Sequence, residues 1–408
     1  MPQDQLLQVL GAEVADLVAK GTAKGAESVV VEVLPAADGR GPRFRLAGEG
    51  DTRYLRMNSN SYLGMSFQPE VIAAEEHAAR RYGTGPGAVR FISGTHDVHV
   101  ALERRLAELH GREAGMIFSS AYATVLSVLV PLVSDQTALI SDALNHNCII
   151  NAMRLARPAR KEVYKHNDVA DLERQLESCA GTCRRAVVVT DGIFSMRGDH
   201  APLPEIVAAA KRHDGRYPEN VVVVVDDSHG VGAFGVTGRG TEEHTGCEPV
   251  DVLVGTLGKA FGVNGGYVVG SATLIDFLRE KSPMYIYSNP ITPAEAAAAL
   301  AAVDLLDSER GRALLAHLRA MTSRFEQGLV RLGFETIPGE HPVVPLMVRD
   351  TARTTALVRH LKDNGVLATG LNYPVVPKGD EEIRFQVNAD HTAADIDHAL
   401  AVLAGFEG

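Results

Sequence analysis

The feature that most constrains the fold of this chain is a series of short, β-branched apolar runs separated by helical patterns. The clearest runs are Ala186 to Thr190, Val221 to Val225 and Val252 to Val254. Continuous runs of this kind are typical of strands that are buried on both faces of a parallel sheet. Apolar residues recur at helical spacing around them, for example from Val98 to Leu109. The sequence therefore predicts an α/β fold in which helices cover a mostly parallel sheet.

The pattern changes twice along the chain and so predicts three parts. Residues 1–55 are expected to form a helical arm and a hairpin, and residues 56–305 a large α/β domain. Residues 306–408 are expected to form a small α+β domain, which an Ala-rich helix at 292–306 joins to the large one. Chemistry is expected in the cleft between them. The small domain should contain strands at 343–348, at Val366 and at 383–387, and helices at 352–364 and from Ala393 onward.

The composition excludes several classes of protein. No apolar run approaches the roughly 18 to 20 residues that a membrane span needs, and the N-terminal segment lacks a basic stretch followed by an apolar one. A net charge of −11 argues against nucleic acid as a partner. Four scattered cysteines, at positions 148, 179, 183 and 247, do not form a disulfide framework. We therefore expect a cytoplasmic protein with neither a membrane nor a nucleic-acid partner.

Polar and Gly-rich segments directly follow the three apolar runs. Asp191 to Met196 follows the first run, Asp226 to Gly230 the second, and Gly255 to Gly262 the third. Ligands of open parallel sheets bind beyond the carboxyl ends of the strands. We therefore expect these three segments to face one cleft.

Lys259 and Asp226 supply the two groups that a pyridoxal 5′-phosphate (PLP) site requires. The amine must form an imine with the cofactor aldehyde, and the carboxylate must keep the pyridine nitrogen protonated so that the ring accepts electrons. Small residues flank Lys259 and leave room for the cofactor, and Thr256 offers a hydroxyl to its phosphate. An isolated Gly-Lys pair is usually a surface turn, but its combination with an aspartate at another strand end favours the PLP interpretation.

The same stretch admits two other interpretations. Gly230 to Gly235 matches the G-x-G-x-x-G pattern of dinucleotide-binding proteins. That pattern needs a helix N-terminus directly afterwards, whereas a loop-like VTGRG segment follows here. Asp226, Asp227 and His229 could bind a metal in principle, but the sequence supplies no convincing further ligands. We therefore expect neither a dinucleotide nor a metal.

Seven segments, taken in order, resemble the α-oxoamine synthases, which are fold-type I PLP enzymes that join an amino acid to an acyl thioester. The resemblance covers almost the whole chain and is strongest to the 2-amino-3-ketobutyrate CoA ligases (glycine C-acetyltransferases), notably through NHNCII, DDSH and YPVVPKG at 373–379. The segments are Asn60 to Gly64, VRFISGTHDVHVALE from Val89, SDALNHNCII from Ser141, TDGIFSMRGD from Thr190, VDDSHGVGAFGVTGRG from Val225, GTLGKAFG from Gly255 and YSNP from Tyr287.

The resemblance implies a role for each residue around the cofactor. Lys259 forms the Schiff base with PLP, Asp226 pairs with the pyridine nitrogen, and His146 stacks on the ring. His229 and Ser195 hydrogen-bond the phenolic oxygen of the cofactor. The family works as homodimers with shared active sites. The phosphate contacts that it implies are Ser120, Ala121, Tyr122 and Thr256 from one subunit, and Ser288 and Asn289 from its neighbour.

The resemblance also implies the substrates and their contacts. Arg384 matches the arginine that binds the substrate carboxylate through two parallel hydrogen bonds, and Asn60 matches another substrate contact. The expected reaction is a Claisen condensation in which Lys259, once displaced by the amino acid, removes its Cα proton. Glycine and acetyl-CoA are the substrates expected first. The chain departs from the ligase pattern at Ser61-Tyr62, Ala121 to Val125 and Thr84 to Val89, so another amino acid, or a longer or carrier-bound acyl thioester with decarboxylation, stays open.

Two other classes of function remain as alternatives. The family includes non-catalytic paralogues that have lost the lysine, but Lys259, Asp226 and His146 occur together here. Another fold-type I reaction, such as an aminotransferase or aldolase reaction, is not excluded by any sequence feature. Only an enzyme that uses a thioester would need a second site for the acyl group. A response to an acyl thioester would therefore distinguish an α-oxoamine synthase from these alternatives.

Overall fold

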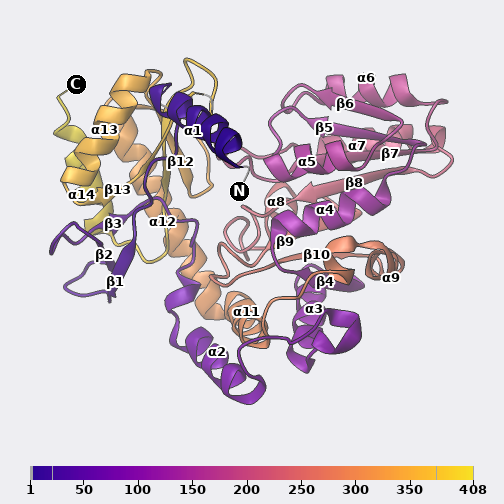
Figure 1. Ribbon diagram of the computed structural model, residues 1–408, viewed down its shortest axis with the longest axis horizontal. Coiled ribbons are helices and arrows are strands. Elements are labelled where there is room, and N and C mark those ends of the chain that lie inside the picture. The colour runs from indigo at the N-terminus through magenta and orange to yellow at the C-terminus, as the bar shows by residue number, and fades with distance from the viewer. Residues whose placement is uncertain (1–2, 21, 374, 408) are drawn as a thin grey trace.

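The computed structural model describes residues 3–20, 22–373 and 375–407, so position 374 of the predicted 373–379 motif lies outside the described residues (Figure 1). Its centre is a seven-stranded sheet of order β4-β10-β9-β8-β7-β5-β6. Neighbours from β6 to β9 are parallel, as predicted, whereas β10 runs antiparallel to both β9 and β4. The strands are β4 (Ala114–Phe118), β5 (Thr137–Asp142), β6 (Arg160–Tyr164), β7 (Arg185–Asp191), β8 (Val221–Asp226), β9 (Val252–Thr256) and β10 (Gly266–Gly270).

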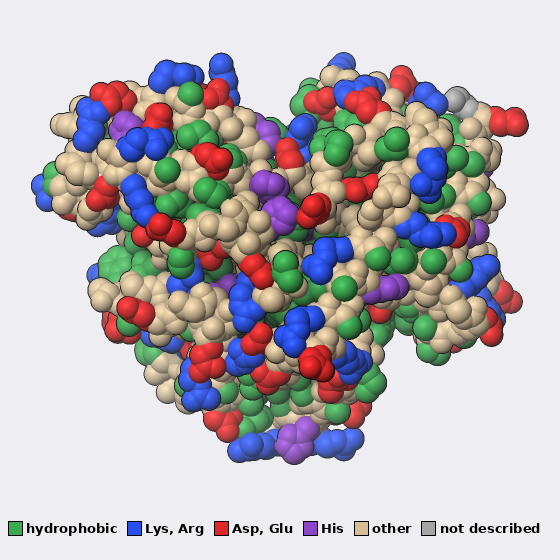
Figure 2. Space-filling model, turned by 180° about the vertical axis from the view of Figure 1, so that it is seen from behind, with side chains coloured by type: hydrophobic (Ala, Val, Ile, Leu, Met, Phe, Trp, Pro, Cys, Tyr) green, Lys and Arg blue, Asp and Glu red, His purple; other side chains and the backbone are tan. Residues whose placement is uncertain are grey.

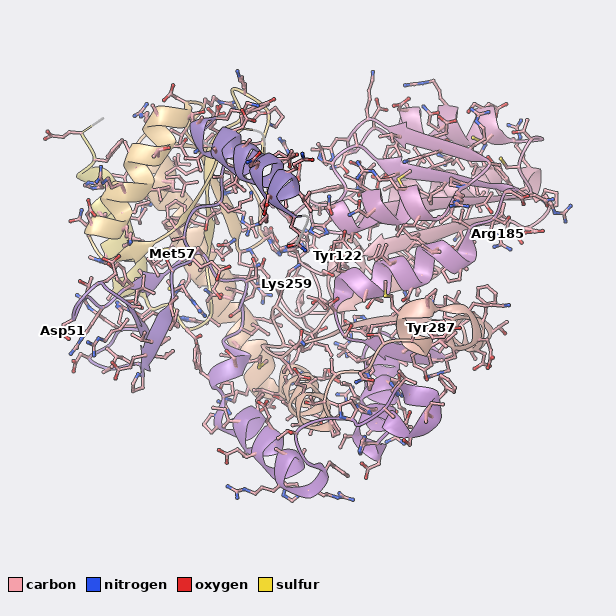
Figure 3. All side chains as sticks on the ribbon, viewed as in Figure 1. Asp51, Met57, Tyr122, Arg185, Lys259 and Tyr287 are labelled. Atoms are coloured by element: carbon pink, nitrogen blue, oxygen red, sulfur yellow. The ribbon has the colours of Figure 1, made fainter. Side chains whose placement is uncertain are left out.

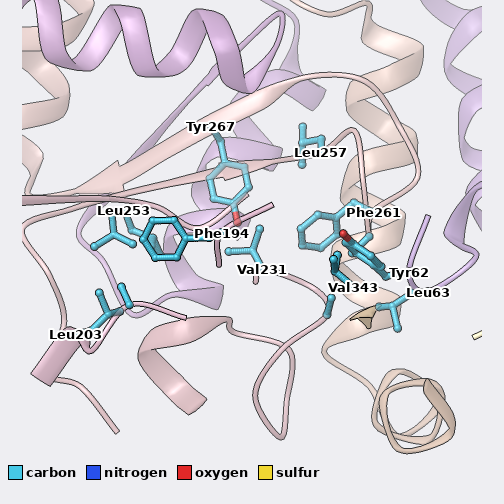
Figure 4. Close-up of a cluster of buried hydrophobic side chains, with 14 of the residues drawn as sticks. Tyr62, Leu63, Phe194, Leu203, Val231, Leu253, Leu257, Phe261, Tyr267 and Val343 are labelled. Atoms are coloured by element: carbon cyan, nitrogen blue, oxygen red, sulfur yellow. The ribbon is translucent and has the colours of Figure 1, made fainter. Parts of the chain in front are cut away.

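Alternate residues of the central strands face two separate cores. Val223 and Val225 of β8 belong to the larger core, whereas Val224 between them belongs to the smaller one. Figure 4 shows part of the larger core, in which Phe194 and Leu253 pack among other buried side chains. Burial on both faces explains why these strands appear in the sequence as continuous apolar runs.

Helices cover both faces of this sheet (Figure 1). The helix predicted at 98–109 is α3, and the Ala-rich helix predicted at 292–306 is α11. The helices of this part are α2 (Pro69–Tyr82), α3 (Asp97–Leu109), α4 (Ala121–Leu132), α5 (Asn147–Leu155), α6 (Val169–Cys179), α7 (Leu203–His213), α8 (Thr241–Thr245), α9 (Ala272–Lys281), α10 (Pro283–Ile286) and α11 (Pro293–Leu306), with short helical turns at Met65–Phe67, Arg90–Gly94 and Asp214–Arg216.

The C-terminal part has its own antiparallel sheet, of order β11-β12-β15-β14. The strands and helices predicted there are present, and a 23-residue helix that was not among the predictions, α12, precedes them. Figure 2 shows that the surface is notched between the two lobes of the molecule. The elements are α12 (Glu309–Arg331), β11 (Glu335–Thr336), β12 (Val343–Met347), α13 (Thr351–Asp363), β13 (Val366–Leu367), β14 (Thr369–Leu371), β15 (Glu382–Gln386) and α14 (Ala393–Ala404).

The N-terminal segment forms the predicted helix and hairpin and packs beside the C-terminal part (Figure 1). Strand β3 (Leu55–Arg56) pairs in parallel with β13, and Arg43 forms an ion pair with the buried carboxylate of Asp395. Helix α1 (Asp4–Ala19) has no buried residue, and β1 (Val30–Leu34) pairs with β2 (Arg43–Leu46). None of the helices in the described part of the chain combines the length and apolarity that a bilayer crossing requires.

Candidate active site

A cavity of about 60 Å³ lies at the carboxyl ends of β7, β8 and β9, where the sequence predicted a ligand site. Lys259 and Tyr122 lie near the centre of the molecule, between the two sheets (Figure 3). Predicted site residues that line this cavity are Ala121, Tyr122, His146, Ser195, Asp226, His229 and Lys259. Cys148, Asp191, Ile193 and Ser228 also line it, although the sequence analysis gave them no role.

Two carboxyl groups end neighbouring strands side by side. The parallel register places Asp191 of β7 opposite Asp226 of β8, and both are at most 6% exposed. Burial, followed by the neighbouring Asp226, raises the pKa of Asp191 well above its usual range. Asp226 Oδ1 accepts hydrogen bonds from the Ser228 hydroxyl (2.6 Å) and amide (3.1 Å). A proton on Asp191 relieves the repulsion between the two groups.

The second oxygen of Asp226 is open to the cavity. Its one hydrogen-bond contact among the described residues is the weak donor Sγ of Cys148, at 3.6 Å. Oδ1 of Asp191 is buried with no hydrogen-bond partner in the described structure. A protonated pyridine nitrogen would supply the donor that Asp226 lacks. These residues therefore fit the ring of PLP.

Lys259 lies in the turn that follows β9. The turn is closed by hydrogen bonds from Gly262 N to Lys259 O (2.9 Å) and from Gly258 N to the hydroxyl of Thr256 (3.1 Å). Gly262 has a φ of 69°, and a Cβ there would lie 2.4 Å from the Ser66 amide nitrogen, so this position requires glycine. Burial lowers the pKa of Lys259 to about 8, although Asp226 opposes the shift. Nucleophilic attack on an aldehyde requires the neutral amine, and near neutral pH Lys259 has a larger neutral fraction than an ordinary lysine.

His229 is held in place by a tyrosine. Its Nδ1 lies 2.7 Å from the hydroxyl of Tyr62, whose side chain is fully buried, and its carbonyl accepts from Nε2 of His341 (2.8 Å). Burial, followed by Lys259, lowers the pKa of His229 well below its usual range. The imidazole is therefore neutral and fixed in orientation. Tyr62 lies in a segment that carried the family resemblance, but no role was predicted for it.

His146 is the N-cap of α5 and lines the cavity. Its Nδ1 contacts Sγ of Cys148 at 3.0 Å, and its amide donates to Asp191 (3.0 Å). Burial lowers the pKa of His146. The ring of Tyr122 stands nearly perpendicular to it, at a centroid distance of 6.3 Å.

The predicted phosphate site lies at the N-terminus of α4. Ser120 caps this 12-residue helix by accepting from Ala123 N (3.1 Å), which leaves the first amides of the helix able to bind an anion. Thr256 is buried beside this site, where its hydroxyl donates to Gly265 O (3.3 Å). Ser120 and Thr256 do not line the cavity themselves. Neither do Ser288 and Asn289, whose predicted contact requires a second subunit.

Arg384 of the C-terminal sheet does not line the cavity but contacts Ser195, which does. Arg384 of β15 donates from Nη1 to the carbonyl of Ser195 (2.9 Å), which joins this sheet to the loop after β7. When the side-chain amide of Gln386 is flipped so that its oxygen faces Arg384, that oxygen accepts hydrogen bonds from Nε and Nη2 of Arg384 (2.7 and 2.8 Å). Asn60 Oδ1 lies 3.3 Å from the hydroxyl of Tyr62, and Asn60 does not line the cavity.

A larger cavity of about 390 Å³ adjoins the first and shares His146 and Ser195 with it. Its wall is mostly apolar and includes the charged residues Arg197, Asp380 and Glu382. The lining residues are Ala143, Leu144, Asn145, His146, Asn147, Phe194, Ser195, Met196, Arg197, Met347, Val375, Val376, Pro377, Asp380 and Glu382.

Comparison with known proteins identifies the family. The family described as "Aminotransferase class I and II" matches residues 52–403. The 8-amino-7-oxononanoate synthase of Thermosipho melanesiensis is 40% identical over 349 residues, which cover 85% of this chain and 87% of that protein. The 8-amino-7-oxononanoate synthase 1 of Bacillus velezensis is 39% identical over 365 residues, 89% of this chain and 90% of the relative.

Solved structures agree. Serine palmitoyltransferase of Sphingomonas wittichii is 28% identical with a TM-score of 0.88 over 99% of this chain and 97% of that one. The structure of SPT with a PLP internal aldimine is 27% identical with a TM-score of 0.86, over 98% and 97%. The chain belongs to the class I and II aminotransferase family of fold-type I PLP enzymes and is an α-oxoamine synthase, a PLP-dependent acyltransferase.

The predictions of fold, cofactor and enzyme class are thereby confirmed. The prediction of glycine and acetyl-CoA as the substrates is not confirmed. The relatives favour the alternative that the sequence left open, another amino acid or a longer or carrier-bound thioester, over glycine with acetyl-CoA. The roles of the individual site residues stay predictions.

Proposed function

We propose that this enzyme condenses an α-amino acid with an acyl thioester longer than acetyl and releases the carboxylate of the amino acid as CO₂. The observation that carries the proposal is the cavity of about 390 Å³ beside the predicted cofactor site. This volume is in the range of sites that hold whole ligands, and an acetyl group would fill only a small part of it.

The name of the relatives supports the same reaction type. Their named product, 8-amino-7-oxononanoate, carries an amino group and a ketone on neighbouring carbons, and no carboxylate on the carbon that bears the amine. A condensation followed by loss of CO₂ would leave such a product.

The large-sheet residues would hold and activate the cofactor. PLP supplies an electron-accepting ring when it is bound through Lys259. Asp226 would keep a proton on the pyridine nitrogen through its open Oδ2, and His229 would donate to the phenolic oxygen from a ring oriented by Tyr62. The N-terminal amides of α4 would bind the phosphate.

Lys259 and Arg384 would handle the substrate. Arg384 would orient the amino acid by binding its carboxylate. With a pKa of about 8, Lys259 Nζ can accept the proton from the substrate Cα at neutral pH. The new bond joins Cα to the thioester carbonyl carbon, and the thiolate leaves with a proton from the site.

The experiment combines one variant with one substrate panel. Lys259→Ala should lose both the visible absorbance of the bound cofactor and turnover, whereas Lys161→Ala, on the exposed edge strand β6, should keep both. Wild-type enzyme should be tested with glycine, alanine and serine against acyl-CoA and acyl-carrier thioesters of increasing length, with CO₂ release measured. Highest turnover with glycine and acetyl-CoA, or a product that keeps its carboxylate, would contradict the proposal.

We also infer a homodimer with shared active sites. Helix α1 exposes Leu6, Leu7 and Leu10 to solvent, and Tyr287, beside Ser288, is 82% exposed. Apolar side chains exposed in this number are typical of surfaces that another subunit covers. Light scattering should give twice the chain mass, and a monomer that is fully active would contradict the inference.

A further inference from the structure

Glu382 places a buried carboxyl group in the wall of the larger cavity. It lies on β15 two positions before Arg384, so both side chains leave the same face of the strand. The residue is 2% exposed, and its Oε1 is buried without any hydrogen-bond partner in the described part of the chain. Glutamate is almost never fully buried unless it is paired.

The cations near Glu382 are already engaged elsewhere. Arg197 forms an ion pair with Asp199 (3.0 Å), and Arg384 donates to Ser195. Burial therefore dominates and raises the pKa of Glu382 to about 7, against the opposing effects of Arg384 and Arg197. Asp380 and Asp199 raise the pKa further. In its charged form this carboxyl needs a hydrogen-bond donor, and the described part of the protein supplies none to Oε1.

The adjacent glutamate shows that donors are available in this segment. Glu381 Oε2 accepts from Gly379 N (2.9 Å) and Oε1 accepts from the hydroxyl of Thr351 (3.2 Å). Its side chain leaves the opposite face of the strand, toward α13. One glutamate is therefore satisfied within the fold, while its neighbour in the cavity is not.

The rest of the cavity wall indicates the shape of the missing partner. Leu144, Met347, Val375 and Val376 give the cavity an apolar lining that suits a hydrocarbon or pantetheine chain. A chain lying on this wall would pass Glu382. Any hydroxyl, amine or amide that it carries there would satisfy the buried oxygen, whereas a carboxylate would meet a like charge above the pKa of about 7, where Glu382 is ionised.

We propose that Glu382 is a specificity-determining residue that accepts a hydrogen bond from an O–H or N–H group of the acyl thioester. The proposal rests on the proposed function, because it requires the thioester in the larger cavity. The donor can come from two sources that share this chemistry, namely a hydroxyl or amine on the acyl chain, or an amide N–H of the pantetheine arm.

Binding and kinetics of matched thioesters test the proposal. The probes are acyl-CoA compounds of equal length ending in methyl, hydroxyl, amine or carboxylate, and their unreactive thioether analogues, measured by calorimetry on PLP-loaded enzyme. A site built to bond a polar group rejects ligands that lack it. If the donor is on the acyl chain, we expect wild type to prefer hydroxyl or amine over carboxylate at least tenfold, and Glu382→Leu to lose that preference.

Thioesters that carry the same acyl groups on a short thiol without amides test the second source of the donor, the pantetheine arm. If the donor is a pantetheine amide, Glu382→Leu should weaken all CoA compounds about tenfold and leave the short thioesters unchanged. Glu382→Gln, which keeps an acceptor oxygen, should retain binding of neutral donors, and Glu381→Gln should bind within twofold of wild type as the matched control.

Two outcomes would overturn the proposal, and they differ in what else they overturn. If Glu382→Leu binds every thioester within twofold of wild type, the proposal fails while the proposed function stands. If wild-type enzyme binds no thioester at all, the proposed function fails as well.

Discussion

The chain places an arginine near a buried glutamate in two regions, and the hydrogen bonding of the glutamate differs between them. In the large part, Arg90 and Glu103 are at most 5% exposed and form a bidentate pair at 3.0 and 3.1 Å. Glu103 also accepts from Ile117 N (3.0 Å) and Arg279 (2.9 Å). In the cleft, Arg384 and Glu382 share a strand face but make no hydrogen bond to each other.

This difference separates structural charges from binding charges. The fold can satisfy a buried carboxylate completely, as it does for Glu103. Oε1 of Glu382 and Oδ2 of Asp226, by contrast, lack a strong hydrogen-bond donor among the described residues, and both residues line the two adjoining cavities. A ligand that enters these cavities can supply the missing partners.

The largest expected effect comes from breaking the structural pair. Glu103→Leu leaves Arg90 buried without its partner, which should lower the free energy of unfolding by about 3 to 5 kcal/mol. Urea denaturation measures this, with the exposed Glu108→Leu as the control, expected to change stability by less than about 0.5 kcal/mol. Equal losses in the two variants would remove the contrast between the regions.

Arg384 should show the opposite behaviour, with binding affected more than stability. Arg384→Leu should raise KM for the amino acid by about 100-fold, which corresponds to roughly 2.7 kcal/mol, because the carboxylate loses its charged partner. Initial rates and urea denaturation on the same preparations separate the two effects. The account fails here if KM is unchanged while stability falls as much as in Glu103→Leu.

The unpaired carboxyl of Glu382 should make stability depend on pH. Its pKa is about 7 in the folded enzyme against an ordinary value of 4.5, with Arg384, Arg197, Asp380 and Asp199 as the charged neighbours. The folded state therefore holds the proton more tightly, and stability falls as pH rises from about 4.5 to 7. Glu382→Gln should gain stability over wild type between pH 5 and pH 8, on the order of 1 to 2 kcal/mol.

Urea denaturation of the unliganded enzyme at both pH values provides the measurement. If the stability of wild type and of Glu382→Gln changes with pH in the same way, the buried oxygen of Glu382 is already satisfied. The contrast between Glu382 and Glu103 would then be lost.

The smallest expected effect concerns a satisfied bond within the cleft. Tyr62→Phe removes the hydroxyl that contacts His229 Nδ1 at 2.7 Å, which should lower kcat about tenfold and stability by about 1 kcal/mol. Because His229 would lose its fixed orientation, the absorbance maximum of the bound cofactor should also shift. A variant with unchanged kcat and spectrum would show that Tyr62 only packs in the core.

The fold was largely predictable because its central strands are buried on both faces. Val221 to Val225 could hardly be anything other than a buried strand, and β8 spans it. The antiparallel direction of β10 could not be predicted, since strand direction depends on the path of the chain and not on local pattern. Helix α12 was not predicted, although its buried residues Leu315, Leu318, Thr322 and Phe325 recur at helical spacing.

The site was predictable only where chemistry and local sequence coincide. Lys259 and Asp226 each follow an apolar run, and that position identified them. Tyr62 reaches His229 across 167 residues of sequence, and no local pattern encodes that contact. Glu382 is one of two adjacent glutamates, and only the strand face decides which of them enters the cavity.

Chemical trapping of the cofactor is the sharpest test of whether Lys259 carries it. Borohydride reduction of the PLP-loaded enzyme fixes the cofactor to the amine that holds it, and peptide mass spectrometry then locates the added mass. The account predicts a single modified peptide that contains Lys259. A cofactor found on another lysine, or on none, would contradict it.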